Sequence, residues 1–432
     1  MARIVVVGAG LAGLACAEAL RAAGQQVVVV EARHRVGGRV WTRRDGFGAQ
    51  LAEAGAEFVN ADHREVLALA ARLGVATEPA RPTYGRALVD AAGRIAPVDA
   101  WDEASHGKLR ADLQAWDDAL DAHATRIDPE DPVRAGAALD RRSAGDLLAE
   151  LQLSALARLI VGRYLRTEFM VPPEEISLLH LAWERARELR CGTEGWECFR
   201  LAGGNDQLAI GLAAALGELV RLGQPVVAIG PTGVRLASGE VLPADVVVAA
   251  VPLPALARVA VEPRLPAEVL DVGYGEGGKV SVQVARRLWR DLHRDGSVVS
   301  DRAHGELWET SAAQPGDAGV ITALLSSHDG AAMVALPDVV QRVTAEIERA
   351  FPGAAGLAGA SCVTDWSNDG WSLGTYAAFA PGQLTRSWAA LRRPHGTLVL
   401  AGEHTDAFAG YMEGALRSGA RAARMALDLL GD

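Results

Sequence analysis

Three glycines near the start of the chain, Gly8, Gly10 and Gly13, have a spacing that suggests chemistry. They form a GxGxxG pattern between the apolar run RIVVV and an Ala/Leu-rich stretch at 11–22. In a strand–loop–helix unit, such glycines allow a tight turn, let the backbone approach a pyrophosphate, and let the helix pack closely on the strand. Glu31 closes the next apolar run, roughly 20 residues on, where a carboxylate accepts a hydrogen bond from a ribose hydroxyl. The pattern therefore predicts a dinucleotide site at a helix N-terminus.

Two more stretches have unusual residues for their positions. In EARHRVGGR (31–39), Gly37 and Gly38 permit backbone conformations close to a ligand, and Arg39 supplies a cation for a phosphate or a ring carbonyl. The alternative is a surface turn with an exposed arginine. In AGYMEGALRSGARAARMAL (409–427), Tyr411 stands where a Ser or Asp would ordinarily cap a helix.

With these stretches, the sequence resembles the FAD-dependent amine oxidoreductases, a family that includes monoamine, polyamine and L-amino acid oxidases. The same resemblance is carried by AEAGAEFV (52–59), LAGGNDQLAIGLAAALG (201–217), PADVVVAAVP (243–252) and VLAGEHTDAFAGYMEGALRSGARAA (399–423). It implies that FAD accepts a hydride equivalent at N5 from the carbon next to an amine nitrogen, giving an imine. It also implies that O2 reoxidises the flavin to give H2O2. The implied cofactor contacts are Gly8, Gly10, Leu11, Ala12, Gly13, Glu31, Ala32, Arg33, Gly37, Gly38, Arg39, Val226, Gly402, Glu403, Tyr411 and Met412.

The resemblance also explains the aromatic helix start. A reduced flavin carries negative charge near N1 and O2, which the free N–H groups of a helix N-terminus stabilise. Met412 is expected to offer its backbone N–H there, while Tyr411 projects into the substrate cavity as one wall of an aromatic cage. Core packing beside a helix is the alternative for Tyr411. Glu403 is implied to lie near the ribityl chain or pyrophosphate, and His404 to be a structural hydrogen-bonding residue.

Lys279 lies in the polar row of GKVSVQV (278–284), an alternating strand pattern. A buried lysine has to be paired or hydrogen-bonded. The resemblance implies that it holds a water against flavin N5 and assists the reaction with oxygen. An edge-strand lysine that blocks aggregation is the alternative.

The second cage wall falls in WSLGTYAAFAPGQ (371–383), where Tyr376 is the first candidate and Trp371 the second. The register is open because the spacing to Pro381-Gly382 is one residue shorter than in monoamine oxidases. Members with a covalent flavin have a cysteine before this aromatic residue, whereas Gly374 and Thr375 stand here, which predicts non-covalent FAD.

Glu57 bears on the substrate. L-amino acid oxidases place an arginine near this segment, and a carboxylate would instead repel a substrate carboxylate and attract an ammonium. This favours a simple amine or diamine, unless Glu57 binds FAD or backbone groups. Three rival functions stay open: an L-amino acid oxidase with a clamp at Arg163 or Arg166, a carotenoid- or porphyrinogen-type desaturase, and a non-catalytic flavoprotein.

The elements that position these residues define an α/β protein. We expect strands at 3–7, 26–32, 278–284 and 396–403, a hairpin and strand over 225–252, and helices at 11–22, 62–74 (with Asp62 as N-cap), 100–190 in several pieces, and after Tyr411. A Rossmann-type FAD-binding domain is expected from 1–75, 200–255 and 360–432. A substrate-binding domain with a mixed sheet is expected from 76–199 and 256–359, with a helical insert at 100–190.

Composition narrows the partners. The 432 residues carry a net charge of -11 and no basic stripe, which argues against nucleic acid. No apolar run approaches about 18 residues, so no membrane span is expected. The four cysteines have neither disulfide nor zinc spacing, and no metal is expected. We expect a cytoplasmic enzyme that meets an amine and O2; a homodimer is compatible with the sequence.

Overall fold

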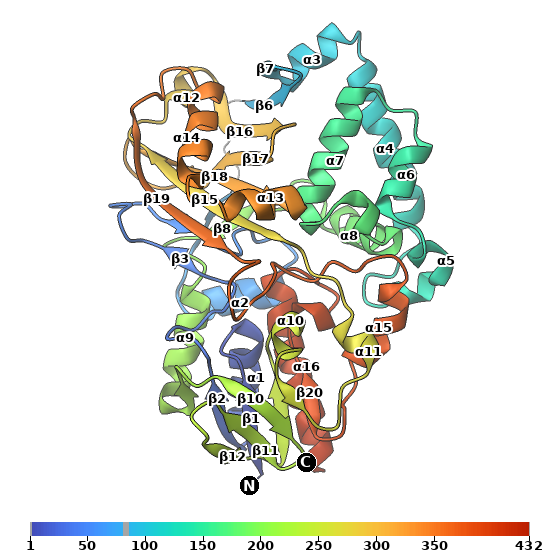
Figure 1. Cartoon of the computed structure of the whole chain (residues 1–432), viewed down its shortest axis with the longest axis vertical. Helices are drawn as coiled ribbons and strands as arrows, with labels where there is room; N and C mark the ends of the chain where they lie inside the picture. The colour runs from blue at the N-terminus through green and yellow to red at the C-terminus, as the bar shows by residue number, and fades with distance from the viewer. Residues whose placement is uncertain (1, 81–85, 432) are drawn as a thin grey trace.

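The computed structural model describes residues 2–80 and 86–431. A parallel five-stranded sheet forms one end of the molecule, where both termini lie (Figure 1). Its order is β20 (Leu398–Leu400), β13 (Val246–Ala249), β1 (Arg3–Val7), β2 (Gln26–Val30), β9 (Val220–Arg221). The predicted strands are present, although β2 and β20 are shorter than expected. Valines predominate in these strands because both faces of a parallel sheet are covered.

Two long helices pack against each other beside this sheet, α1 (Leu11–Ala22) and α16 (Met412–Leu430). They approach so closely that a Cβ at Gly419 would lie 2.3 Å from the carbonyl oxygen of Ala12. The glycine in α16 therefore fixes the last helix on the first one.

A second sheet continues this end of the molecule, in the order β12 (Val241–Pro243), β11 (Gly233–Leu236), β10 (Val226–Gly230), β14 (Ala260–Val261). Around the two sheets are α2 (Arg64–Arg72), α9 (Gln207–Leu216), η3 (Gly217–Leu219), α10 (Leu253–Leu256), α11 (Ala267–Leu270), α15 (Gln383–Leu391) and η4 (Glu403–Thr405). The N-cap of α2 is His63 rather than the expected Asp62.

A seven-stranded mixed sheet forms the opposite end of the molecule. Its order is β19 (Ala358–Asp365), β15 (Gly277–Val284), β18 (Gly319–Ser326), β17 (Glu306–Glu309), β16 (Arg294–Ser300), β6 (Arg86–Ala91), β7 (Arg94–Pro97). The helices α12 (Leu288–Asp291), α13 (Ser327–Val334) and α14 (Val339–Ala350) accompany it. β15 lies between two neighbours, so Lys279 is not on an edge strand, and the aggregation-blocking alternative does not apply.

The predicted helical insert lies beside this sheet (Figure 1) and comprises α3 (Val98–Ala104), α4 (Lys108–Ala124), η1 (Pro132–Ala135), α5 (Ala137–Asp140), α6 (Ala144–Glu150), α7 (Ala155–Phe169), η2 (Pro173–Glu175) and α8 (Leu178–Cys191). Serines begin three of these helices: Ser143, Ser154 and Ser177 each accept backbone N–H groups of the first turn. Two small ribbons, β3 (Thr42–Arg43) with β4 (Ala52–Glu53) and β5 (Thr77–Pro79) with β8 (Phe199–Leu201), complete the fold. Within the described ranges, no helix combines the length and the apolar character needed to cross a membrane.

Candidate active site

A cavity of about 1280 Å³ runs from the N-terminal glycine loop to the helical insert. All the predicted cofactor residues line it except Gly13, which lies behind the loop. Lys279, Glu57, Tyr376, Tyr411 and Trp371 also line it. The structure thus brings together residues from both ends and the middle of the chain.

The glycine loop fits a pyrophosphate. Gly8 has a φ of +104°, and a Cβ at Gly13 would lie 2.0 Å from the carbonyl oxygen of Gly8. No atom lies within 4 Å of the Cβ position at Gly10, which leaves room for a ligand beside the backbone. Gly10 is the N-cap of α1 and supplies no side chain there, so the first N–H groups of the helix remain available to an anion.

The carboxylate of Glu31 is oriented so that it can accept a hydrogen bond from a ribose hydroxyl. Its two carboxylate oxygens accept the backbone N–H groups of Ala9, at 2.8 Å, and of Arg33, at 2.9 Å. Each oxygen keeps a further lone pair for a hydroxyl donor. The side chain is buried at the end of β2, so its orientation is fixed before a ligand arrives.

Arg39 does more than offer a cation. Its guanidinium donates to the carbonyl of Thr375 at 2.6 Å and to Glu403 at 3.0 Å. Glu403 in turn accepts the N–H of Gly410 at 2.8 Å. This chain of contacts joins the second glycine stretch to both segments predicted to form the aromatic cage. Arg33 makes the parallel link, donating to Asp369 and Ser372.

The last helix begins as the sequence predicts. Met412 is the first residue of α16, and the N-cap Tyr411 makes no capping hydrogen bond with its side chain. Met412 lines the cavity and is buried. An uncapped helix N-terminus that faces a cavity suits the negative charge of a reduced flavin.

Lys279 and Glu57 form a buried ion pair at 2.7 Å, and Lys279 also donates to the carbonyl of Gly55 at 2.9 Å. Arg200 contacts the other carboxylate oxygen at 2.8 Å. Trp308 and Thr310 donate to the same oxygen, at 2.9 and 2.5 Å. Burial alone would raise the pKa of Glu57, but Lys279 and Arg200 outweigh it and lower that pKa to about 2. Glu57 is therefore an ionised anchor for two cations. Because Lys279 and Arg200 offset its negative charge, that charge is not available to attract a substrate ammonium.

Tyr376 lies close to Gly410, the residue that precedes Tyr411. A Cβ at Gly410 would lie 3.5 Å from the Tyr376 ring, and Tyr411 is the next residue in the chain. The Tyr376 hydroxyl donates toward the carbonyls of Thr167 and Glu168. Trp371 is 44% exposed and its backbone contacts Asp369, close to the Arg33 link. Of the two candidates, Tyr376 has the better position for a second wall.

The Tyr411 hydroxyl contacts two carboxyl groups, that of the half-buried Glu168 at 2.9 Å and that of the buried Glu184 at 2.7 Å. A phenol has one proton, so both contacts are hydrogen bonds only if one carboxyl group is protonated. Burial and the nearby Glu184 raise the pKa of Glu168 well above its usual range. Glu184 is ion-paired with Arg187. Glu168 is therefore the group that holds the proton.

Further acidic side chains line the same cavity, which is called the chamber below: Asp117, Glu188, Glu197, Asp295 and Glu306. Burial, reinforced by Glu197, raises the pKa of Glu306 to about 7. Arg163 and Arg166, the two candidates for a carboxylate clamp, are absent from the residues that line the cavity. Neither arginine is therefore placed to clamp a substrate carboxylate in this cavity.

Sequence reasoning missed most of these chamber residues. Arg200, Trp308 and Thr310 complete the Glu57 cluster, and Glu168 and Glu306 come from α7 and β17. Arg200 directly precedes the segment LAGGNDQL and could have been noticed there. Glu168 and Glu306 stand in segments that carry no motif, so no signal identified them.

One group outside the cavity has the composition of a metal site. Ligand atoms of Asp90, His304 and Glu346 lie within 4.8 Å of one another, which the sequence spacing did not suggest. Arg349 pairs with both carboxylates and Arg302 also pairs with Glu346, so two guanidinium charges already offset the two carboxylates.

A dinucleotide loop on a parallel sheet, opening into an aromatic chamber beside an uncapped helix, defines a flavin-dependent oxidoreductase. Comparison with known proteins gives the family. The family model for flavin containing amine oxidoreductases matches residues 11–427, and the chain belongs to that family.

Individual relatives support the same assignment. The chain is 30% identical to the flavin-containing monoamine oxidase AofH of Mycobacterium tuberculosis, over 99% of this chain and 97% of that protein. It is 28% identical to amine oxidase [flavin-containing] B of Cavia porcellus, over 99% of this chain and 86% of that protein.

Solved structures agree. A putrescine oxidase bound to putrescine superposes with a TM-score of 0.86 at 26% identity, covering 100% of this chain and 99% of that one. Cyclohexylamine oxidase from Brevibacterium oxydans IH-35A gives 0.86 at 26% identity, covering both chains fully.

The protein is thus an FAD-dependent amine oxidase, with the α/β fold that the sequence predicted. Its FAD is bound non-covalently, and none of the four cysteines is among the residues that line the cavity. The desaturase and non-catalytic alternatives are not favoured.

Proposed function

We propose that the preferred substrate is a primary amine with a second cationic group, such as the diamine putrescine. The acidic lining of the chamber beyond Tyr411 carries this proposal. Glu184 is paired with Arg187, and Glu188 with Arg185. Glu306, which also lines the cavity, is the carboxyl group suited to meet a distal ammonium. A cation beside Glu306 would lower the raised pKa of this carboxyl group and ionise it. Binding of a cationic substrate would therefore produce the negative charge that attracts the distal ammonium.

The residues divide the work as follows. FAD supplies the electron acceptor for the C–N bond oxidation. Tyr411 and Tyr376 flank the reacting amine, and their low-dielectric surroundings penalise the ammonium and favour the neutral amine that reacts. The ion pair with Glu57 holds the ammonium of Lys279 beside the carbonyl of Gly55. From this position Lys279 orients a water molecule for the reoxidation of the flavin by O2.

Steady-state kinetics with putrescine and butylamine test the substrate proposal. A charge-assisted hydrogen bond contributes about 1.5–3 kcal/mol, so kcat/KM for putrescine should exceed that for butylamine by roughly ten- to a hundredfold. Glu306→Gln should remove most of this preference and leave butylamine unaffected. Glu194→Gln, an exposed glutamate outside the cavity lining, is the matched control. An unchanged ratio in Glu306→Gln would exclude the proposal.

The proposal also covers the oxidant that regenerates the flavin, the cell compartment and the oligomeric state. We infer that O2 reoxidises the flavin with release of H2O2, which a peroxidase-coupled assay detects. All four cysteines are free, as is usual in a reducing compartment such as the cytoplasm. A homodimer is included as the assembly, to be tested by sedimentation of the purified protein.

A further inference from the structure

A second, smaller hollow of about 270 Å³ lies on α16, outside the flavin cavity. Four arginines line it: Arg392, at the end of α15, and Arg417, Arg421 and Arg424 of α16. The last three are spaced i, i+4 and i+7, so they share one face of the helix. Such a concentration of guanidinium groups is unexpected in a chain with a net charge of -11.

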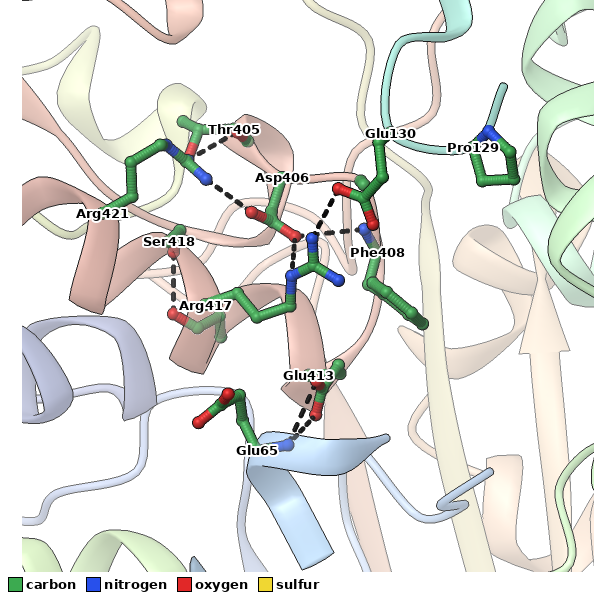
Figure 2. A network of polar contacts seen from close by, with 12 residues as sticks. Glu65, Pro129, Glu130, Thr405, Asp406, Phe408, Glu413, Arg417, Ser418 and Arg421 are labelled. Atoms are coloured by element: carbon green, nitrogen blue, oxygen red, sulfur yellow. Dashed lines mark hydrogen bonds and ion pairs between the residues drawn. The ribbon is translucent and has the colours of Figure 1, made fainter. Parts of the chain in front are cut away.

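Part of this charge is balanced inside the protein (Figure 2). Asp406 pairs with Arg421 and with Arg417, and Arg417 reaches Glu130 at 2.7 Å. Arg421 also donates to the carbonyl and hydroxyl oxygens of Thr405, at 2.6 Å each. These contacts hold the two inner arginines in place.

The rest of the charge lacks a carboxylate partner. Arg392 donates to the carbonyl of Thr405 at 3.0 Å, and Arg424 makes no hydrogen bond or ion pair within the described residues. The acidic residues of the lining are Asp406, already engaged by two arginines, and Glu65. Burial lowers the pKa of Arg421, and the neighbouring charges of Arg392 and Arg417 act in the same direction. The hollow therefore has an excess of positive charge and several unused N–H donors.

Guanidinium N–H groups that keep donor capacity and line one hollow suit an oxyanion with several acceptor oxygens. Guanidinium groups bind phosphate with two parallel hydrogen bonds, whereas a spherical chloride ion lacks the pair of oxygens that matches the guanidinium fork. We propose that this hollow binds a phosphate group, either as a free phosphate or pyrophosphate or as part of a nucleotide. Its principal donors are Arg392 and Arg424, and Arg417 and Arg421 supply the supporting charge.

The site is next to the catalytic segment. Thr405 and Asp406 lie between Glu403, which anchors Arg39, and Tyr411. A phosphate that offsets the repulsion among these arginines would stabilise the fold of this segment. The binding free energy adds to the stability of the folded state because the unfolded chain lacks the site.

The experiment uses the FAD-loaded protein. Thermal unfolding and titration calorimetry are run with pyrophosphate, inorganic phosphate and AMP, against sodium chloride at equal ionic strength. The absorbance of bound flavin is followed throughout, to show that the FAD site stays filled. Arg424→Gln and Arg392→Gln are compared with Arg342→Gln, an exposed arginine on α14.

We expect a saturable rise in the melting temperature with pyrophosphate that chloride does not reproduce. Each of Arg424→Gln and Arg392→Gln should weaken binding by roughly tenfold or more, since each removes a charged donor, while Arg342→Gln binds as the wild type does. The affinity ratio of AMP to phosphate distinguishes a nucleotide from the free ion. The absence of a saturable shift, or an equal loss in Arg342→Gln, would overturn the proposal.

Discussion

Removing the charge of Glu57 should destabilise the protein far more than a typical surface substitution. Glu57→Gln keeps the shape and much of the hydrogen bonding, but leaves Lys279 and Arg200 buried without their shared anion. The pKa of Glu57 falls from 4.5 to about 2 on folding, and each unit is worth about 1.4 kcal/mol. The carboxylate therefore contributes about 3 kcal/mol at neutral pH, within the range found when one partner of a buried pair is removed.

The expected change in melting temperature follows from the chain length. At about 2.1 cal/mol/K per residue, 432 residues give an unfolding entropy of about 0.9 kcal/mol/K, so the midpoint falls by about 3 °C if the chain unfolds as one unit. Differential scanning calorimetry of the holoprotein measures this. Glu218→Gln, at an exposed glutamate without a partner in the described structure, serves as the control.

The pH dependence of the free energy of unfolding gives a second measure of the contribution of Glu57 to stability. Because the folded-state pKa of Glu57 is lowered, its contribution is complete above pH 4.5 and disappears as the pH falls toward 2. The stability difference between wild type and Glu57→Gln should therefore narrow over that window. A difference below about 1 kcal/mol at pH 7, or one that is independent of pH, would refute the argument that Glu57 is an ionised anchor.

Four other outcomes are expected. Gly13→Ala should yield protein with little bound FAD, measured by the ratio of flavin to protein absorbance, because the new Cβ would lie 2.0 Å from the carbonyl oxygen of Gly8. Lys279→Met should slow flavin reoxidation by O2 by roughly 10²-fold in stopped-flow traces, with anaerobic reduction little changed. Trp371→Ala should keep kcat/KM within about twofold, since this side chain is 44% exposed to solvent. The putrescine-to-butylamine ratio of kcat/KM should fall as the pH drops below about 7, where Glu306 becomes protonated and loses its charge, and this fall should be absent in Glu306→Gln.

The sequence predicted the parts of the site that depend on backbone shape. The close approach at Gly13, the acid after β2 and the aromatic N-cap of α16 follow from local constraints, so their residues are readable in a single chain. The surroundings of Glu57 were not readable in the same way. Its partners Lys279 and Arg200 are separated from it by 222 and 143 residues, and only folding brings them together.

The acidic chamber shows the same limit more strongly. Glu168 in α7 and Glu306 in β17 resemble ordinary charged residues of a helix and a strand, and the sequence offers no reason to select them. Their importance comes from burial next to other acids, a property of packing rather than of pattern. The argument for a cationic substrate was therefore attached to Glu57 in the sequence, whereas the proposal made from the structure rests on Glu306.

The contacts of Arg39 with Thr375 and Glu403 have a consequence for biosynthesis. The glycine loop at residues 8–13 is made first, but the helix N-terminus at Met412 leaves the ribosome about 400 residues later. At roughly 5–20 residues per second, this interval lasts roughly 20 to 80 s. During that time the nascent chain lacks β20 and α16, and the apolar side of α1 that packs on α16 has no partner. Cofactor capture is therefore a late event in the life of each molecule, and a nascent chain that stalls before residue 403 would be colourless and exposed to chaperones or proteases.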